Sequence, residues 1–292
     1  MELASQDGQQ KLIRSCLVCG DRAPRPFRAQ DGYQIVACGG CGLRYLDPQP
    51  DAAALERLYA ETYYHSDDPL ARGYARYTAE AENWRATFRD RLRFLPAAPA
   101  RLLDVGAAAG FFVEQARQVG YDARGVEPST WASAYARDEL HQPVETGTLE
   151  GRAYEAASFD VVTLWEVIEH LPDPRAFLHE IARVLAPGGT LALSTPDAGS
   201  LAARLSGRRW LGWQKVPEHL WFFDGPALAR LLDEAGFTIT HRRYVSLTVT
   251  WGFALDRLSA LVGVPLPAPH ALRERAVAVN PGYDLMIVAR KR

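Results

Sequence analysis

The sequence predicts an α/β protein: a doubly wound, mostly parallel sheet preceded by a small cysteine-bearing ribbon. Three observations predict it. From Arg101 onward, short apolar strands alternate with amphipathic helices, which is typical of a sheet covered by helices on both faces. A run of small residues, 106–110, directly follows the first of these strands. Four cysteines lie within the first 41 residues, in two Cys-x2-Cys pairs separated by eighteen residues.

The composition limits the class of protein. The chain has 292 residues, of which 48% are hydrophobic and 23% are charged, as in an ordered globular protein with a sizeable core. The net charge of −2 disfavours a protein that grips the phosphate backbone of a nucleic acid. No apolar stretch of about 18 residues occurs, and residues 1–10 are polar. We therefore expect no membrane span, no signal peptide and a cytoplasmic location.

The cysteine pairs predict a structural zinc site. Four thiolates at this spacing suit a closed tetrahedral site, and the glycine after each pair lets the backbone turn around the sulfurs. Disulfides are disfavoured in a reducing cytosol, and a redox pair would need only two cysteines. We expect the ribbon to span residues 1–47, with the ligands Cys16, Cys19, Cys38 and Cys41. An alternative is that its arginines bind RNA, although a small ribbon also needs solvated charges: Arg14, Arg22, Arg25, Arg28 and Arg44.

Residues 48–96 are expected to form a helical connector. Apolar spacing predicts one helix over 51–63 and a second over 70–95. The aromatic stripe of the second helix either packs on the following domain or contributes a lid. In the second case Tyr63, Tyr64 or Tyr74 would cover a cofactor.

The remaining residues, 97–292, are expected to form the sheet domain. Gly120, Pro187 and Gly236 mark helix ends, and Asp224 is placed to cap a helix. The expected strands are 101–105, 122–126, 143–145, 159–164, 190–194, 237–244 and 285–291, and the expected helices are 111–119, 131–140, 174–185 and 226–234.

Ligands bind beyond the carboxyl ends of the strands in such a sheet. The small residues after the first strand let the backbone approach a ligand, with helix amides behind them. The loop lacks the Lys-Ser/Thr of a phosphate cradle and one glycine of a dinucleotide fingerprint. Glu127 ends the second strand, where a carboxylate can accept both hydroxyls of a ribose. Leu149 and Glu150 follow the third strand and are placed to flank an adenine.

Four segments together resemble class I S-adenosylmethionine-dependent methyltransferases. They are Leu103-Asp-Val-Gly106 with Gly110, Val126-Glu127, the run from Phe159 to His170, and Leu185-Ala-Pro-Gly-Gly189. The resemblance covers about residues 85–292 and implies a seven-stranded sheet whose last strand is antiparallel. A cysteine ribbon ahead of such a domain is similar to a bacterial subgroup found mainly in sugar, polysaccharide and natural-product pathways.

The resemblance also implies which residues hold the cofactor S-adenosylmethionine. Gly106 and its neighbours approach the methionine part, Glu127 holds the ribose, and Trp165 covers the methionyl end. Ala108 departs from the family, which often has glycine there, but alanine is small enough for binding to survive. The expected cofactor-binding residues are Asp104, Gly106, Ala107, Gly110, Phe111, Glu127, Pro128, Leu149 and Trp165, with Tyr64 as the lid.

The run Glu166-x-x-Glu169-His170 follows the fourth strand, beside the expected methyl group. Its three polar side chains share one face if the run is a helical turn. With His219 from a later segment, they are predicted to be catalytic and to form a mixed site for Mg²⁺ or another divalent metal. This arrangement is similar to that of demethylubiquinone-type O-methyltransferases and of small-RNA methyltransferases. The alternatives are a metal-free site in which a histidine is the general base, and a structural role.

Aromatic residues gather between the fifth strand and the last one. We expect a lid for the acceptor at about 197–224 and an insertion at about 246–281, which contains a helix over 253–262 and a Pro-rich loop. The aromatic side chains line an acceptor pocket, form a homodimer face, or pack on one another and on the N-terminal helices. They are Trp210, Trp213, Trp221, Phe222, Phe223, Trp251 and Phe253.

The sequence thus predicts a methyltransferase that acts on a hydroxyl oxygen of a small molecule, such as a sugar, a polysaccharide precursor or a natural product. The first alternative is a C- or N-methyltransferase of such an intermediate with histidine as the base. The second is an RNA methyltransferase that uses the ribbon, which the net charge disfavours. A non-catalytic scaffold is the third, and the presence of Gly106, Glu127, Glu166 and His170 argues against it.

Overall fold

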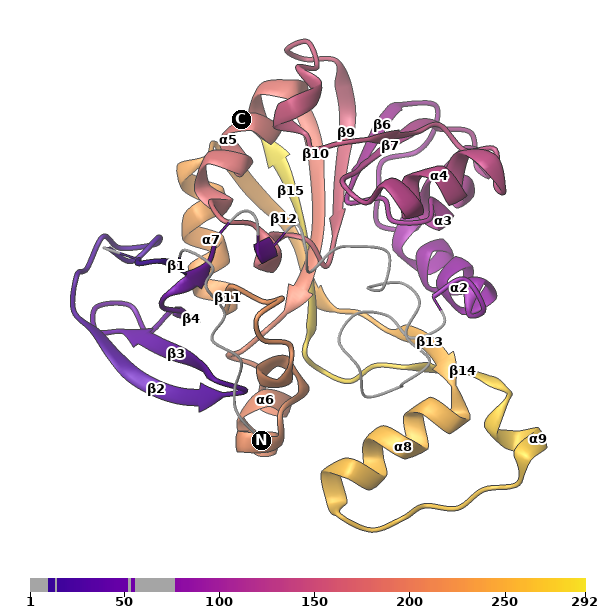
Figure 1. Ribbon diagram of the computed structural model, residues 1–292. Coiled ribbons are helices and arrows are strands. Elements are labelled where there is room, and N and C mark those ends of the chain that lie inside the picture. Colours follow the sequence, from indigo (N-terminus) through magenta and orange to yellow (C-terminus); the bar gives the residue numbers. More distant parts are fainter. Residues whose placement is uncertain (1–9, 14, 52–53, 56–76) are drawn as a thin grey trace.

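The computed structural model describes residues 10–13, 15–51, 54–55 and 77–292 (Figure 1). At its centre is a seven-stranded sheet with the strand order β12-β15-β10-β9-β6-β7-β8. These strands are β6 (Arg101–Val105), β7 (Asp122–Glu127), β8 (Val144–Thr146), β9 (Phe159–Trp165), β10 (Leu185–Pro196), β12 (Phe237–Tyr244) and β15 (Asp284–Lys291).

The strand directions confirm the predicted fold class. The strands from β10 through β9, β6 and β7 to β8 pair in parallel. β15 lies between β10 and β12 and is antiparallel to both. The carboxyl ends of β6, β7, β8, β9 and β10 therefore meet at one edge of the sheet, where a ligand site is expected.

Helices cover both faces of the sheet. The helices α2 and α7 each pack on a different hydrophobic cluster, and the side chains of β9 alternate between the two: Val161 and Trp165 join one cluster, and Val162 and Leu164 join the other. The helices are α2 (Ala81–Leu92), α3 (Phe111–Gln118) and α4 (Thr130–Asp138) on the first face, and α5 (Pro174–Val184) and α7 (Gly225–Glu234) on the second.

Most predicted elements of this domain agree with the structure to within two residues. Asp224 caps α7 as expected, because its side chain accepts a hydrogen bond from the Ala227 amide. β10 is longer than predicted: it starts at Leu185 rather than Thr190, with a register shift between these two residues. Of the helix expected over 51–63, Asp51, Ala54 and Leu55 are described: Ala54 and Leu55 are helical, and Asp51 is not. Of the helix expected over 70–95, α2 accounts for Ala81–Leu92, and residues 70–76 lie outside the described part.

The ribbon is built into the rest of the molecule. It forms a four-stranded sheet of β2 (Pro24–Gln30), β3 (Tyr33–Cys38), β4 (Arg44–Leu46) and β11 (Trp221–Phe222), in the order β11-β4-β3-β2. β11 belongs to the segment expected as an acceptor lid, and the sequence did not predict it. A second small sheet pairs β1 (Gln10–Lys11) with β5 (Gln49–Pro50).

The segment 197–224 connects the ribbon to the sheet domain. It contains α6 (Leu201–Ser206), two 3-10 turns, η4 (Gly207–Arg209) and η5 (Leu211–Gln214), and β11. Its aromatic residues are buried in the same cluster as the ribbon core and the α5–α7 face: Trp210, Trp213, Trp221, Phe222 and Phe223. Packing on one another and on the ribbon therefore accounts for these five.

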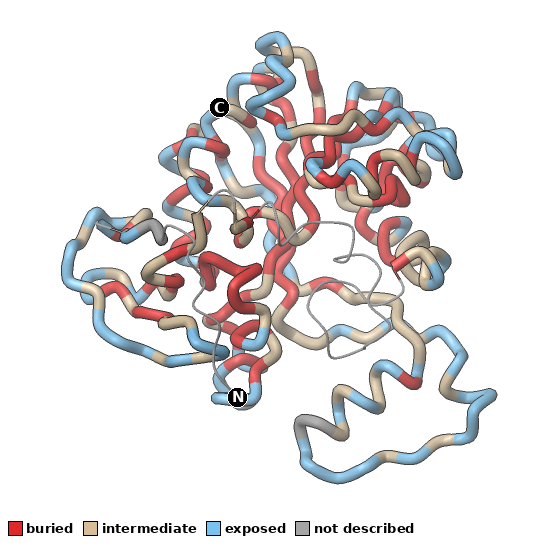
Figure 2. The backbone as a smooth tube through the Cα atoms, in the orientation of Figure 1, coloured by how far each residue is buried: buried red, intermediate tan, exposed pale blue. Residues whose placement is uncertain are grey.

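The insertion extends away from the sheet (Figure 1). β13 (Leu247–Thr250) pairs with β14 (Ala276–Val279), and between them lie α8 (Trp251–Val262) and α9 (His270–Arg273). The helix α8 was predicted, whereas the strand pair was not. Figure 2 shows many exposed residues in this part, and Trp251 and Phe253 are about 40% exposed. Within the described residues, no helix is long and apolar enough to cross a membrane.

Candidate active site

The loop after β6 makes a tight turn next to the end of β9. Gly106 and Gly110 have φ angles of 75° and 80°, in the left-handed region that favours glycine. A Cβ atom on Gly106 would lie 2.5 Å from a methyl carbon of Val167. Ala108, which departs from the family pattern, also has a positive φ of 46°. The absence of a Cβ atom at Gly106 lets the Val167 side chain pack directly against this loop.

Glu127, at the end of β7, holds this loop in place. One carboxylate oxygen accepts the Ala108 amide and the other accepts the Ser129 amide, both at 2.9 Å. The Glu127 side chain is buried, and Pro128 after it is exposed. A carboxylate oxygen has two lone pairs and can accept two hydrogen bonds. Glu127 therefore joins two of the loops that the sequence assigned to the cofactor.

Asp104 is a buried residue of β6, two positions before Gly106 of the loop. The Thr163 hydroxyl donates to its carboxyl group over 2.6 Å. Burial raises the pKa of Asp104 to about 8, which favours the protonated acid. We interpret Asp104 as a support of the loop.

The other predicted cofactor residues lie around the same edge. Ala107, Phe111 and Leu149 are buried, whereas Glu150 in η2 (Glu150–Arg152) is exposed. The Trp165 ring packs edge-on against Phe112, with ring centroids 5.3 Å apart. The Tyr63, Tyr64 and Tyr74 side chains lie outside the described residues. The role of each residue in binding the cofactor stays a prediction.

Glu169, His170 and His219 form a compact group in which Glu169 and His219 are buried and His170 is half-buried. Their metal-ligating atoms all lie within 4.8 Å of one another. One Glu169 oxygen accepts the Thr195 hydroxyl at 2.8 Å, and the other lies 3.8 Å from His170 Nε2 and 3.9 Å from His219 Nε2. The two imidazole rings meet edge to face at 4.8 Å. The predicted meeting of the later histidine with the first is thus seen in the structure.

Burial shifts the pKa values of all three side chains toward their uncharged forms. It raises the pKa of Glu169 to about 8 and lowers the pKa of His170 to about 4. Burial, together with the neighbouring His170, lowers the pKa of His219 well below its ordinary value. At 3.8 and 3.9 Å, the contacts from Glu169 to the two histidines are too long for hydrogen bonds.

The backbone fixes the tautomer of His170. Its Nδ1 lies 2.9 Å from the Glu218 carbonyl oxygen, which can only accept, so Nδ1 carries the proton. The lone pair is then on Nε2, the atom that faces Glu169. Such an imidazole serves as a metal ligand or as a base.

Glu166 lies apart from this group. The expected helical turn is not formed: η3 (Ile168–His170) is a 3-10 turn that starts after Glu166, whose φ is 55°. Glu166 instead accepts the Ser194 hydroxyl at 2.7 Å. Burial and the neighbouring Asp284 and Glu169 raise the pKa of Glu166 well above its ordinary value. The structure brings together three of the four predicted metal ligands, and the four-ligand set stays a prediction.

Sequence reasoning missed a buried polar network beside Glu166. Arg91 of α2 donates to Ser194 and, over 2.9 Å, to Asp284, and its guanidinium lies 5.0 Å from the centre of the Trp165 ring. Both ends of the Arg91–Asp284 ion pair are almost fully buried. Arg91 occurs in a strongly charged stretch, so its sequence context resembles that of a solvated residue. The one feature of the sequence that could have indicated its burial was its position on the inner face of α2.

The four cysteines also converge. The sulfurs of Cys16 and Cys41 are 3.5 Å apart, those of Cys19 and Cys38 are 3.4 Å apart, and all four lie within 4.8 Å of one another. Gly20 and Gly42 have φ angles of 75° and 79°, as expected of the turns after each pair. With zinc–sulfur bonds of about 2.3 Å, the sulfur atoms of a tetrahedral site lie about 3.8 Å from one another. The residues present therefore fit a zinc ion.

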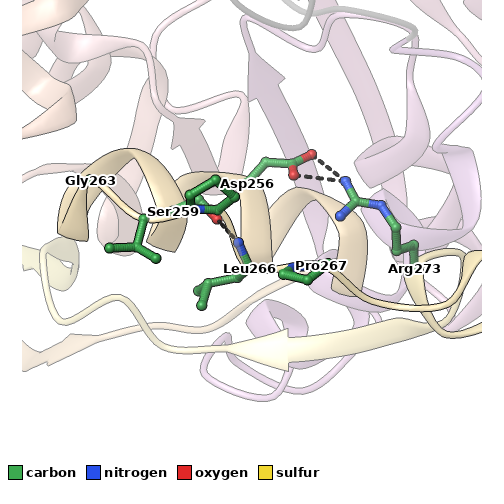
Figure 3. Close-up of a pocket in the computed structure, with 8 residues that line it drawn as sticks. Asp256, Ser259, Gly263, Leu266, Pro267 and Arg273 are labelled. Atoms are coloured by element: carbon green, nitrogen blue, oxygen red, sulfur yellow. Dashed lines mark hydrogen bonds and ion pairs between the residues drawn. The ribbon is translucent and has the colours of Figure 1, made fainter.

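Two surface hollows are separate from this site. One, of about 550 Å³, lies between α8 and the Pro-rich loop (Figure 3), where Arg273 pairs with Asp256 at 2.6 Å. The other, of about 580 Å³, lies along β7 and β8 and contains Arg117, Arg124 and Arg137. Neither is lined by the residues that the sequence assigned to cofactor or catalysis.

Comparison with known proteins agrees with the fold. The family model described as "Methyltransferase domain" matches residues 74–242. Two solved structures show the same fold: a methyltransferase from Bacillus halodurans (TM-score 0.52, 18% identity, 71% of this chain and 98% of that chain) and a SAM-dependent methyltransferase from Archaeoglobus fulgidus (TM-score 0.51, 18% identity, 72% and 94%).

Relatives of known name are ubiquinone biosynthesis O-methyltransferases. One from Cereibacter sphaeroides is 32% identical over 179 residues, which cover 58% of this chain and 72% of the relative. One from Azorhizobium caulinodans is 27% identical over 253 residues, which cover 82% and 95%. The family match extends over more than half of the chain and includes the loop after β6, Glu127 and the Glu169–His170–His219 group. The chain therefore belongs to the methyltransferase-domain family and is a class I S-adenosylmethionine-dependent methyltransferase.

Proposed function

We propose that this enzyme transfers a methyl group from S-adenosylmethionine to a hydroxyl oxygen of a small molecule: a sugar, a polysaccharide precursor or a natural product. The observation that carries the proposal is the buried Glu169–His170–His219 group at the carboxyl end of β9, beside the Gly106–Gly110 loop. Transfer to oxygen is supported by the names of the relatives, which are O-methyltransferases.

The residues of the first two loops suit the cofactor. Gly106 makes a tight left-handed turn packed against Val167, and the two Glu127 oxygens accept backbone amides of the loops after β6 and β7, which supports the proposed ribose contact. S-adenosylmethionine supplies an electrophilic methyl group on a sulfonium. The work left to the protein is to bring the acceptor oxygen into line with that methyl group and to remove its proton.

A neutral histidine can take that proton. In this role His170 or His219 accepts the acceptor's hydroxyl proton, the oxygen forms a bond to the methyl carbon, and the carbon–sulfur bond breaks to leave S-adenosylhomocysteine. Burial keeps both imidazoles neutral, which is the form that a base requires.

The same group also fits a divalent metal. Its donor set is one carboxylate oxygen and two imidazole nitrogens, and the Glu169 oxygen that faces the histidines is buried without a hydrogen-bond partner among the described residues. A bound divalent ion lowers the pKa of a coordinated hydroxyl. Glu169, His170 and His219 would hold it, and Thr195 and the Glu218 carbonyl would orient the first two.

The network around Arg91 suits a polar acceptor. Three of its buried atoms lack a hydrogen-bond partner within the described ranges: Arg91 Nε and Trp165 Nε1, which donate, and Asp284 Oδ1, which accepts. Buried polar atoms are normally paired. A molecule with several hydroxyl groups offers both kinds of partner.

We also propose that Cys16, Cys19, Cys38 and Cys41 hold a structural zinc ion, on the convergence of their sulfurs. Burial raises the pKa of Cys16 to about 11, so its thiolate requires a cation for stability. Elemental analysis of the freshly purified protein is expected to give one zinc per chain, and Cys19→Ser is expected to lower it. A zinc content near zero would exclude this site.

The test of the activity is a methyl-transfer assay with labelled S-adenosylmethionine and a panel of hydroxylated acceptors. We expect an O-methylated product and a loss of about 10²–10⁴-fold in kcat for Glu169→Gln and His219→Asn. The matched control is His179→Asn, because His179 is exposed on α5. A product methylated on carbon or nitrogen would contradict the proposal. Chelation that removes every metal except the ribbon zinc distinguishes the two mechanisms, since only the metal-assisted one loses activity.

A further inference from the structure

The fourth strand of the ribbon sheet comes from the methyltransferase domain and starts two residues after His219. In β11, Trp221 is paired with Tyr45 and Phe222 with Arg44 of β4. The Tyr45 and Trp221 rings are in contact, with centroids 5.5 Å apart, and both side chains are buried. The ribbon thus holds the main chain immediately beyond a predicted catalytic residue.

Main-chain hydrogen bonds connect the ribbon to the active-site turn through Leu220. The Leu46 amide donates to the Leu220 carbonyl at 2.9 Å, and the Leu220 amide donates to the Glu169 carbonyl at 2.9 Å. The Trp221 indole donates to the Leu171 carbonyl at 2.8 Å. His219 is the residue before Leu220, so its backbone is fixed between β4 on one side and the Glu169 turn on the other.

The position of β4 depends in turn on the cysteine turns. The Cys38 amide donates to the Leu43 carbonyl and the Gly42 amide donates to the Cys38 carbonyl, which closes the second turn directly before β4. Arg44 is only three residues from Cys41. β4 pairs with β3 on one side and, at two residue pairs, with β11 on the other.

We propose that the ribbon is a positioning element for catalysis: through Tyr45 and Leu46, β4 holds His219 against Glu169 and His170. This rests on the proposed role of His219. The β4 edge of the ribbon sheet is paired with β11, so the ribbon and the His219 segment are joined within one sheet.

The test uses the full-length protein with Tyr45→Ala, which keeps all four cysteines but removes the ring that packs on Trp221. We expect kcat to fall at least tenfold, the Kd for S-adenosylmethionine to change less than twofold, and hydrogen exchange at the Leu220 and Trp221 amides to accelerate. Arg25→Ala, at an exposed position of β2, is the matched ribbon control and should change none of these.

An activity-independent signal comes from the imidazole ¹⁵N resonances. Those of His170 and His219 should shift in Tyr45→Ala, whereas that of the exposed His270 should not. Unchanged kcat and unchanged His219 resonances would overturn the proposal, and so would a parallel loss of S-adenosylmethionine affinity, which indicates general unfolding. A fully active His219→Asn would instead refute the proposed catalytic role of His219, and the resonances would then report separately whether the ribbon positions this residue.

Discussion

At the scale of single residues, Glu127 has two roles: an expected contact with the cofactor, which the sequence pattern indicates, and the support of two loops, which the pattern does not indicate. Its carboxylate ends β7 at the position where a ribose is expected, and it also fixes the loops after β6 and β7 by accepting one amide from each. Hydrogen bonds to a charged group contribute about 1.5–3 kcal/mol each. Loss of this side chain therefore affects both the ligand contact and the shape of the loop.

We predict that Glu127→Ala weakens S-adenosylmethionine binding by at least about tenfold, because it removes at least one charge-assisted hydrogen bond. Isothermal titration calorimetry measures the change. Glu127→Gln, which keeps an acceptor oxygen, should lose less, and the exposed Glu155→Gln should bind normally. Unchanged affinity in Glu127→Ala would show that the ribose is held elsewhere.

Asp104 gives a prediction about pH. Its pKa is about 8 in the fold and about 4 in an unfolded chain, so the folded state binds more protons between these values. The free energy of unfolding should then fall as the pH rises from about 4 to about 8, by at most about 1.4 kcal/mol per pH unit from this group. Asp104→Asn should flatten that slope in urea titrations of the cofactor-free protein. Asp138→Asn, at an exposed position, should keep it. An equal slope in Asp104→Asn would mean that Asp104 is ionised in the fold.

At the scale of elements, the Gly106–Gly110 loop and the η3 turn depend on each other. The side chain of Val167 fills the space next to Gly106, so the loop after β6 and the turn after β9 pack as one unit. A substitution in either the loop or the turn is therefore expected to affect both cofactor binding and the position of the catalytic group.

We predict that Gly106→Ala weakens S-adenosylmethionine binding for two separable reasons. The added Cβ atom meets Val167 at 2.5 Å, and the φ of 75° costs an alanine about 1–2 kcal/mol. The double variant Gly106→Ala/Val167→Ala relieves only the clash, so calorimetry should show partial recovery. Full recovery would mean that the backbone angle is unimportant, and no loss in the single variant would contradict the packing.

The elements also show what a sequence can predict. The apolar runs of β6 and β9, and the glycine that ends α3, have strong local signals, and these elements were found within a residue or two. β11 has two residues and β13 has four, which is too short for a periodic pattern. Glu166 was expected on a helical turn, but its backbone is left-handed and the 3-10 turn begins only at Ile168. The Arg91–Asp284 pair joins residues 193 positions apart, and no local pattern reports such a contact.

At the scale of the whole molecule, the ribbon and the sheet domain share one hydrophobic cluster. Ile35 and Tyr45 of the ribbon belong to the same buried group as Trp221 and as Leu228 of α7. Such a continuous core is expected to unfold cooperatively.

We predict that calorimetric unfolding of the full chain shows one transition, and that chelation of the ribbon zinc lowers its midpoint without dividing it. The reason is that disordering the ribbon exposes buried aromatic side chains of the sheet domain, such as Trp221 and Phe222. Two separate transitions, only one of which responds to the chelator, would show that the ribbon folds on its own.

The pairing of β4 with β11 also has a consequence for the order of events during synthesis. Tyr45 and its partner Trp221 are separated by 176 positions in the chain. The ribbon leaves the ribosome early, yet the open edge of its sheet has no partner until most of the methyltransferase domain has followed. The ribbon sheet is therefore completed only after most of the methyltransferase domain that follows it has been made, and in the interval its unpaired edge is exposed to other nascent chains.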